Sequence, residues 1–176
     1  HLGEGITKIQ KNTAKFKYLK NEPGSSQSLN DNIVWAIHKD HKNTLWVGTY
    51  RGGLNFIDQN NNKSAAYKFD VDDPGSISNN HIRAIKEDNF NNLWIGTYNG
   101  GINRFKPQTG KFERFLYDPD NSNSLSANQV QDIFIESDTT IWVATFGGGL
   151  NKLSFKTNSS DELPEFTVYE NDPSDS

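Results

Sequence analysis

One pattern repeats along the whole sequence with a constant step of 48 from each copy to the next. Tryptophan recurs at positions 46, 94 and 142, each time inside the same kind of five-residue run, Leu45–Thr49, Leu93–Thr97 and Ile141–Thr145. A pair of glycines follows each run after a few residues. Self-similarity at a period of about 40–50 residues indicates a repeat architecture, in which each unit is one supersecondary element. The chain is therefore limited to a series of similar units placed side by side.

Each unit contains four short runs with the composition of β-strands. They are rich in β-branched and aromatic residues and are bounded by Gly, Asn, Asp and Pro. In the first complete unit we predict strands at Ile33–Lys39, Thr44–Tyr50, Gly53–Ile57 and Ala65–Phe69. The glycine pair between the second and third runs suits a hairpin that needs positive φ. No segment has a sustained helical period, so we expect an all-β chain.

Four strands in a unit of this length, with one tryptophan and one glycine pair, are typical of a β-propeller. Ile6 falls one period before Leu54, so the first residues correspond to the second half of a unit. We predict a single β-propeller portion over residues 1–176, with about 3.5 four-stranded blades that follow the step of 48, half of a seven-bladed ring. Its expected parts are a half blade at 1–27 and full blades at 28–75, 76–123 and 124–176.

The last unit is longer than the others. The step from Asp118-Pro119 to Asp172-Pro173 is 54, where the period predicts 48. We predict a six-residue insertion that forms a surface loop before an outermost strand at 166–169. The chain begins within a unit and has no initiator methionine, so we expect it to be a piece of something longer or a half-propeller that assembles.

Composition excludes several classes of partner. The 18 basic residues are outnumbered by 22 acidic ones, and the net charge of −4 is scattered along the chain. A nucleic-acid-binding domain would need a basic face, so no nucleic-acid partner is predicted. Cysteine is absent, which removes disulfides and thiolate metal sites. We also predict no direct membrane contact in this segment.

Motifs of catalysis and metal binding are missing from the sequence. It has no phosphate-binding loop, no His-Glu-x-x-His and no Gly-x-Ser-x-Gly. His38, Asp40 and His41 lie at the end of a predicted strand, and we expect a solvated turn there instead of a metal site. Asp40, Asp88 and Glu136 recur at the same step as the tryptophans and are expected to cap equivalent turns. We predict no catalytic residue, no metal and no cofactor.

Residues that vary between units on a shared face are the candidates for ligand binding. In a propeller the link from an outer strand to the next inner strand shares a face with the link between the second and third strands. Aromatic rings there can stack on sugar C–H surfaces, while amide and guanidinium groups bond hydroxyls. The alternative is turn residues that pack between neighbouring blades. The candidates are Tyr50, Arg51, His81, Tyr98, Asn99 and Phe146.

Other residues of this face repeat without change. Asn32, Asn80 and Asn128 lie one period apart, which favours structural caps over ligand specificity. The repeated Trp46, Trp94 and Trp142 are likewise expected to fill contacts between blades.

The repeated unit resembles a known family. Ser76–Asp88, Asn92–Thr97 and Gly100–Phe105 are similar to the two-component regulator propeller repeat, and three in-register copies extend the resemblance over essentially the whole chain. The family forms the periplasmic sensor region of hybrid two-component systems of Bacteroides and relatives. Complete members have two seven-bladed propellers, a β-sandwich, a membrane span and cytoplasmic histidine kinase modules. They sense oligosaccharides from polysaccharide breakdown and switch on utilisation genes.

The resemblance implies that this chain is a periplasmic ligand-sensing portion of a sensor histidine kinase, and that kinase activity lies elsewhere in the polypeptide. Two alternatives remain open. One is a propeller lyase or hydrolase, for which only His81 qualifies on the axial face. The other is a protein-interaction propeller without a small-molecule ligand. An open half-propeller would expose strand edges, so we expect either a homodimer that closes a seven-bladed ring or the remaining blades of a longer chain.

Overall fold

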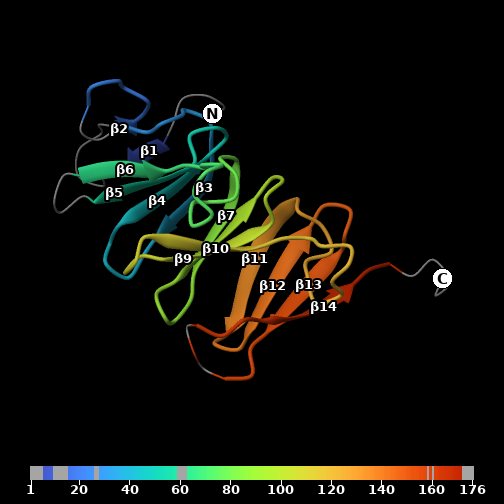
Figure 1. Cartoon of the computed structure of the whole chain (residues 1–176). Helices are drawn as coiled ribbons and strands as arrows, with labels where there is room; N and C mark the ends of the chain where they lie inside the picture. The colour runs from blue at the N-terminus through green and yellow to red at the C-terminus, as the bar shows by residue number, and fades with distance from the viewer. Residues whose placement is uncertain are drawn as a thin grey trace.

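The computed structural model describes residues 6–9, 16–25, 28–58, 63–157, 159 and 161–171. These residues form fourteen antiparallel strands, and none of them is helical. The strands make one two-stranded and three four-stranded sheets (Figure 1). Their bounds are β1 (Ile6–Ile9), β2 (Phe16–Leu19), β3 (Val34–Lys39), β4 (Leu45–Thr49), β5 (Leu54–Asp58), β6 (Lys63–Tyr67), β7 (Ile82–Glu87), β8 (Leu93–Thr97), β9 (Ile102–Lys106), β10 (Lys111–Phe115), β11 (Val130–Ser137), β12 (Thr140–Thr145), β13 (Leu150–Ser154) and β14 (Glu165–Tyr169).

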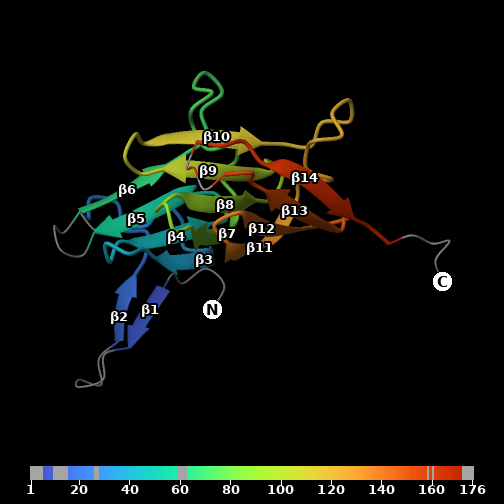
Figure 2. The same cartoon turned by 90° about the horizontal axis from the view of Figure 1, so that it is seen from below.

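The three large sheets are blades of an open β-propeller. Each is a meander in which consecutive strands are neighbours, from β3 to β6, from β7 to β10 and from β11 to β14. The first strands of the sheets lie next to one another, with β7 in contact with both β3 and β11. Figure 2 shows the same succession from another side, with the β1–β2 hairpin at one end and β14 towards the other. The all-β propeller fold predicted from the repeat is confirmed, whereas the division at 27/28, 75/76 and 123/124 stays a prediction.

A β-bulge interrupts the first strand of every blade. The pairing register shifts between Val34 and Ala36 in β3, and equivalent shifts occur in β7 and β11. A bulge leaves one residue without a cross-strand partner and re-aims its side chain. The residues at these three shifts are Trp35, Arg83 and Gln131. The same backbone position thus carries a different kind of side chain in each blade, and two of these side chains belong to the site described below.

The hydrophobic core lies between the sheets. One cluster between the first and second blades contains Trp46, and another between the second and third contains Trp94. These tryptophans are 5% and 1% exposed, which confirms their predicted role in contacts between blades. Trp142 differs because no described sheet lies beyond the third blade. It is only half-buried, and it contacts Tyr169 and Lys152 of its own sheet.

Repeated polar residues cap repeated turns, as the sequence predicts. The carboxylates of Asp40, Asp88 and Glu136 each accept the indole N–H of the tryptophan six residues later, at 2.9, 2.8 and 2.8 Å. Asn32, Asn80 and Asn128 each accept a backbone N–H eleven residues earlier, at 2.6, 2.8 and 2.8 Å. The asparagine positions are therefore structural.

The second glycine of each repeated pair explains why the pair recurs. Gly53, Gly101 and Gly149 have φ of 75°, 63° and 68°. A Cβ atom there would lie 2.2 Å from the carbonyl oxygen of the last residue of the neighbouring outer strand. Both the positive φ and the lack of space require glycine, so the predicted hairpin geometry is confirmed.

Two expectations about the outer strands need adjustment. The strand predicted at Ala65–Phe69 runs from Lys63 to Tyr67, because Lys63 already pairs with Asp58 and the Phe69 amide donates to Asn80 Oδ1 instead of to the sheet. The last strand begins at Glu165, one residue before the expected Phe166.

The predicted insertion is confirmed. Ten residues separate Ser154 from Glu165, whereas four separate Lys106 from Lys111 in the preceding blade. Asp172-Pro173, from which the insertion was inferred, lies outside the described residues. Among the described residues, no helix is long and apolar enough to cross a membrane.

Candidate functional site

Two kinds of loop meet on one face of the sheets. The residue after the second strand of each blade donates its backbone N–H to the residue just before the first strand. The three bonds are Tyr50 to Ile33 (2.9 Å), Tyr98 to His81 (3.0 Å) and Phe146 to Gln129 (2.8 Å). Residues distant in sequence are thus placed side by side in the same way in every blade. Only the second blade has a histidine at this junction.

His81 lies between aromatic rings of two neighbouring blades. Its ring stacks on Tyr98 of its own blade, with 4.8 Å between ring centres. Tyr50 of the preceding blade meets it edge-on at 4.5 Å, and Trp35 lies 5.7 Å away. The backbone of His81 is fixed by Asn79, whose Oδ1 accepts the His81 N–H at 2.8 Å. The imidazole is therefore held at a blade junction and not on a free loop.

Two arginines extend this aromatic group. The Arg83 guanidinium lies 4.3 Å from the ring centre of Trp35 and 5.3 Å from that of Tyr98. The Arg51 guanidinium lies 5.0 Å from the ring centre of Tyr50. A guanidinium above an aromatic face is attracted by the quadrupole of the ring. We call this group of six residues the His81 cluster: Trp35, Tyr50, Arg51, His81, Arg83 and Tyr98.

Polar atoms of the His81 cluster are left without protein partners. His81 Nε2 and Arg83 Nε are buried, and neither makes a hydrogen bond with any described residue. Burial lowers the pKa of His81 below its ordinary value of 6.5, and the positive charge of Arg83 lowers that pKa further. His81 is thus a neutral imidazole at pH 7, able to donate from one ring nitrogen and accept at the other.

Four of the six predicted ligand residues come together in this cluster: Tyr50, Arg51, His81 and Tyr98. Asn99 is exposed beside Tyr98 and makes no hydrogen bond with another described residue. Phe146 is 66% exposed on the loop of the third blade and makes no ring contact within the described part of the chain. Ligand binding by all six residues stays a prediction.

Trp35 and Arg83 were missed by sequence reasoning. They lie within the first strands, whereas the search was confined to the links between strands. The signal was available, because positions 35, 83 and 131 are one period apart and hold Trp, Arg and Gln. Variation at one register position of a repeat marks a residue that the scaffold itself does not require.

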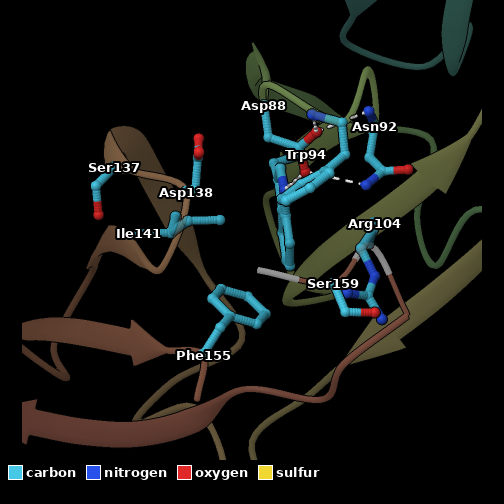
Figure 3. Close-up of a pocket in the computed structure, with 10 residues that line it drawn as sticks. Asp88, Asn92, Trp94, Arg104, Ser137, Asp138, Ile141, Phe155 and Ser159 are labelled. Carbon is cyan, nitrogen blue, oxygen red and sulfur yellow. Dashed lines mark hydrogen bonds between the residues drawn. The ribbon is translucent and has the colours of Figure 1, made fainter. Parts of the chain in front are cut away.

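A small hollow lies between the second and third blades (Figure 3). Trp94, Arg104 and Phe155 line it, together with Asp88, Asn92 and the turn at Ser137 and Asp138. The space there is about the size of one water molecule. Its polar groups are satisfied: Arg104 donates to Glu113 Oε2 through Nε (2.8 Å) and Nη2 (2.5 Å), and to the Glu162 carbonyl through Nη1 (2.7 Å). This region packs the blades together and offers no room for a ligand.

The inserted loop takes part in this packing. Phe155 meets Trp94 edge-on with 5.9 Å between ring centres, and Lys106 forms an ion pair with Asp161. The expectation of a plain surface loop was therefore incomplete, because the segment folds back onto β9 of the preceding blade.

His38 and His41 also join neighbouring blades. Both rings face Glu87 on β7, His41 through Nδ1 (2.5 Å) and His38 through Nε2 (3.4 Å). Residues 41–43 are exposed, as expected for a solvated turn, but the contact with the largely buried Glu87 of the next blade was not anticipated. No group of three residues that could hold a metal ion is found in the described part of the chain.

Comparison with solved structures supports the fold. The chain resembles the extracellular domain described as that of a hybrid two component system, BT3049, from B. thetaiotaomicron, with 24% identity and a TM-score of 0.78 over 96% of this chain. The corresponding domain of BT4673 from the same organism gives 20% identity and a TM-score of 0.69 over 95%. This chain spans about a fifth of either domain, 22% in both cases.

Sequence comparison identifies the repeat. No curated protein sequence matches this chain. The family model of the two component regulator propeller matches residues 28–51 and 76–99, which are one period of the repeat apart. Each match covers the segment that carries the first two strands of a blade and the loop after them. The first and second complete blades are therefore similar to the two component regulator propeller repeat over these two segments.

Proposed function

We propose that this chain is the ligand-sensing portion of the periplasmic region of a hybrid two-component sensor histidine kinase, and that it responds to oligosaccharides released by polysaccharide breakdown. The observation that supports the ligand is the His81 cluster. It combines three aromatic rings, on which the C–H face of a sugar can stack, with guanidinium and imidazole groups that bond hydroxyls. Partly exposed Trp35 and Tyr98, at 45% and 37%, leave ring surface accessible.

The same proposal covers the location of this chain and the part of the polypeptide that carries the kinase activity. The solved domains of similar fold are extracellular domains of two-component systems, which supports an extracellular or periplasmic position. The kinase chemistry would lie in other parts of the polypeptide. We propose no catalytic role for this segment, because the ring contacts of His81 are with Trp35, Tyr50 and Tyr98, and a hydrolase or lyase would need an acid or base partner beside it.

Ring completion by further blades is favoured over a homodimer. One face of the third blade carries Trp142, Leu150 and Tyr169. In the second blade the equivalent residues are, in the same order, Trp94, Ile102 and Phe115. Trp94 and Ile102 are buried against the third blade, and Phe115 is partly buried there. Leu150 and Tyr169 are 39% and 49% exposed, so this face is built to pack against another sheet. The β1–β2 hairpin matches the third and fourth strands of a blade. A second copy would bring the same outer strands and not the missing inner ones.

Titration calorimetry with a library of defined oligosaccharides tests the ligand. We expect one class to bind wild-type protein and to lose binding in Tyr98→Ala. Tyr169→Ala is the matched control, because it removes another exposed tyrosine far from the His81 cluster. Equal loss in both variants, or binding by no member of the library, would contradict the proposed ligand. Appearance of cleavage products would instead support the lyase or hydrolase alternative.

A further inference from the structure

The four arginines of the chain fall into two groups. Arg104 and Arg114 have acceptors: Arg104 pairs with Glu113, and Arg114 donates to Ser76 and to the carbonyl oxygen of Asp73. Arg51 and Arg83 have none, because no side-chain hydrogen bond or ion pair joins either guanidinium to a described residue. Both unpaired guanidinium groups belong to the His81 cluster.

The lack of an acceptor is unusual for this chain. Acidic residues outnumber basic ones, 22 to 18, so carboxylates are plentiful. The nearby carboxylate of Asp31 accepts the backbone N–H groups of Ile33 (3.0 Å) and Arg51 (2.8 Å), and it does not form an ion pair with the Arg51 side chain. The Arg83 Nε is removed from water without a replacement bond, which costs free energy. A site that leaves Arg83 without a protein acceptor, with the exposed Arg51 in the same cluster, is prepared for an anion.

We propose that the His81 cluster recognises an acidic sugar, one that carries a carboxylate or a sulfate group on its ring. This deepens the proposed function and rests on it. The guanidinium fork matches two oxygens of a carboxylate or sulfate, and such charge-assisted bonds are among the strongest that a binding site can make. The exposed parts of the Trp35 and Tyr98 rings, both of which lie near Arg83, would pack against the sugar ring itself.

The bulge explains how Arg83 stays available. In the β7–β8 register Ile82 faces Thr97 and Ala84 faces Gly96, so no residue of β8 is opposite Arg83. A regular strand would place a cross-strand neighbour beside it, and such a neighbour could supply an acceptor. The equivalent positions, Trp35 and Gln131, carry no charge, so only the second blade presents a cation from this point.

Matched ligands and matched variants test the proposal. The ligands are oligogalacturonates with their carboxyl-reduced counterparts, and sulfated carrageenan oligosaccharides, which carry no carboxylate, with their desulfated counterparts. Binding to the full chain is measured by titration calorimetry at low and high salt. We expect an acidic ligand to bind at least 10-fold more tightly than its neutral counterpart. Its affinity should fall as salt rises, because exposed charges are screened.

Arg83→Gln should weaken binding of the acidic ligand by about 10–100-fold, the range for a lost hydrogen bond between charged groups. Arg51→Gln should weaken it less, and Arg83→Lys should restore part of the loss by keeping the charge without the fork. Lys39→Gln is the control, because it removes one exposed positive charge from β3 at the turn, away from Trp35. Thermal unfolding of each variant confirms that it is folded.

The outcomes separate this inference from the proposed function. Equal affinity for acidic and neutral ligands, unchanged in Arg83→Gln but lost in Tyr98→Ala, would overturn the acidic-sugar inference and leave oligosaccharide sensing intact. Binding by none of the four ligand types would overturn the inference, and failure of the wider library would remove the proposed function as well. A preference for carboxylate over sulfate, or the reverse, identifies the source of the anion.

Discussion

Two regions of this molecule place an arginine over a tryptophan, and they differ in what else they provide. Arg104 lies 5.6 Å from the ring centre of Trp94, and Arg83 lies 4.3 Å from that of Trp35. Arg104 is 2% exposed and donates to Glu113 and to the Glu162 carbonyl. Arg83 makes no such bond. An arginine over a tryptophan therefore packs two blades together where the protein supplies hydrogen-bond acceptors, as at Arg104. It stays open to a ligand where the protein supplies none, as at Arg83.

The pairing of the strands produces the difference. Glu113 stands directly opposite Arg104 in the β9–β10 register, so the sheet itself provides the acceptor. Arg83 lies at a bulge, where the register passes from Ile82 to Ala84. Because a bulge adds one residue to the strand, Arg83 has no cross-strand neighbour, whereas an arginine in a regular strand would have one.

Truncation of the two tryptophans should give the largest contrast. Trp94→Ala leaves a cavity between the second and third blades and should lower the free energy of unfolding by about 3–5 kcal/mol. Trp35 is 45% exposed, so Trp35→Ala should lower it by less than about 1 kcal/mol. Urea denaturation followed by far-UV circular dichroism measures both. Similar losses in the two variants would show that Trp35 is a core residue and would break the comparison.

Removal of the acceptors should have the next largest effect. Glu113→Ala leaves the Arg104 guanidinium buried with a single carbonyl partner, and we expect a loss of about 2–3 kcal/mol, below the usual range for a broken buried pair because Glu113 is 35% exposed. Arg83→Met should leave the unfolding free energy unchanged or slightly higher, since it removes an unsatisfied buried group. A stability loss in Arg83→Met as large as that in Glu113→Ala would mean that Arg83 has an acceptor after all.

A smaller effect should appear in the pH dependence of stability. The pKa of His81 is lowered in the folded state, so between that pKa and 6.5 the unfolded chain binds more protons than the folded one. The contribution of neutral His81 to the free energy of unfolding is therefore present above about pH 6.5 and is lost as the pH falls. Melting temperatures between about pH 5 and pH 8 should decline less steeply in His81→Gln, which copies Gln129 of the third blade. Identical slopes in the two proteins would contradict a buried neutral His81.

The fold was predictable because its determinants are repeated in the sequence. The tryptophans, the glycine pairs and the Asp88-type caps each occur in every complete unit, and each is required locally by a turn or by the contact between blades. Only the strand ends shifted, as at Lys63–Tyr67, where a long-range bond from the Phe69 amide to Asn80 competes with the sheet. The residues around Phe69 alone do not reveal this bond, so the end of the strand could not be predicted from them.

The site was predictable only in part because it depends on differences between units. Tyr50, His81 and Tyr98 were found as variable loop residues, and the backbone bonds between the loops bring them together. Trp35 and Arg83 escaped because a bulge cannot be seen in an alternating pattern, although it decides which way these side chains point. The partner of each histidine at the first turn, Glu87, was likewise hidden because it comes from another blade.

The smallest effect is expected where the inserted loop touches the Arg104 region. Lys106→Gln breaks the ion pair with Asp161, whose side chain is 79% exposed, so the urea midpoint should stay the same within error. The pKa of Asp161 is lowered by its hydrogen bond to Lys106 and by the charge of Lys106, so acidification should abolish even this small contribution. High salt should have the same result. If Lys106→Gln instead destabilised the protein as much as Glu113→Ala, the loop would be holding Arg104 in place. The acceptor would then come from the insertion and not from the register of the sheet, and the contrast with Arg83 would rest on the inserted loop and not on the bulge.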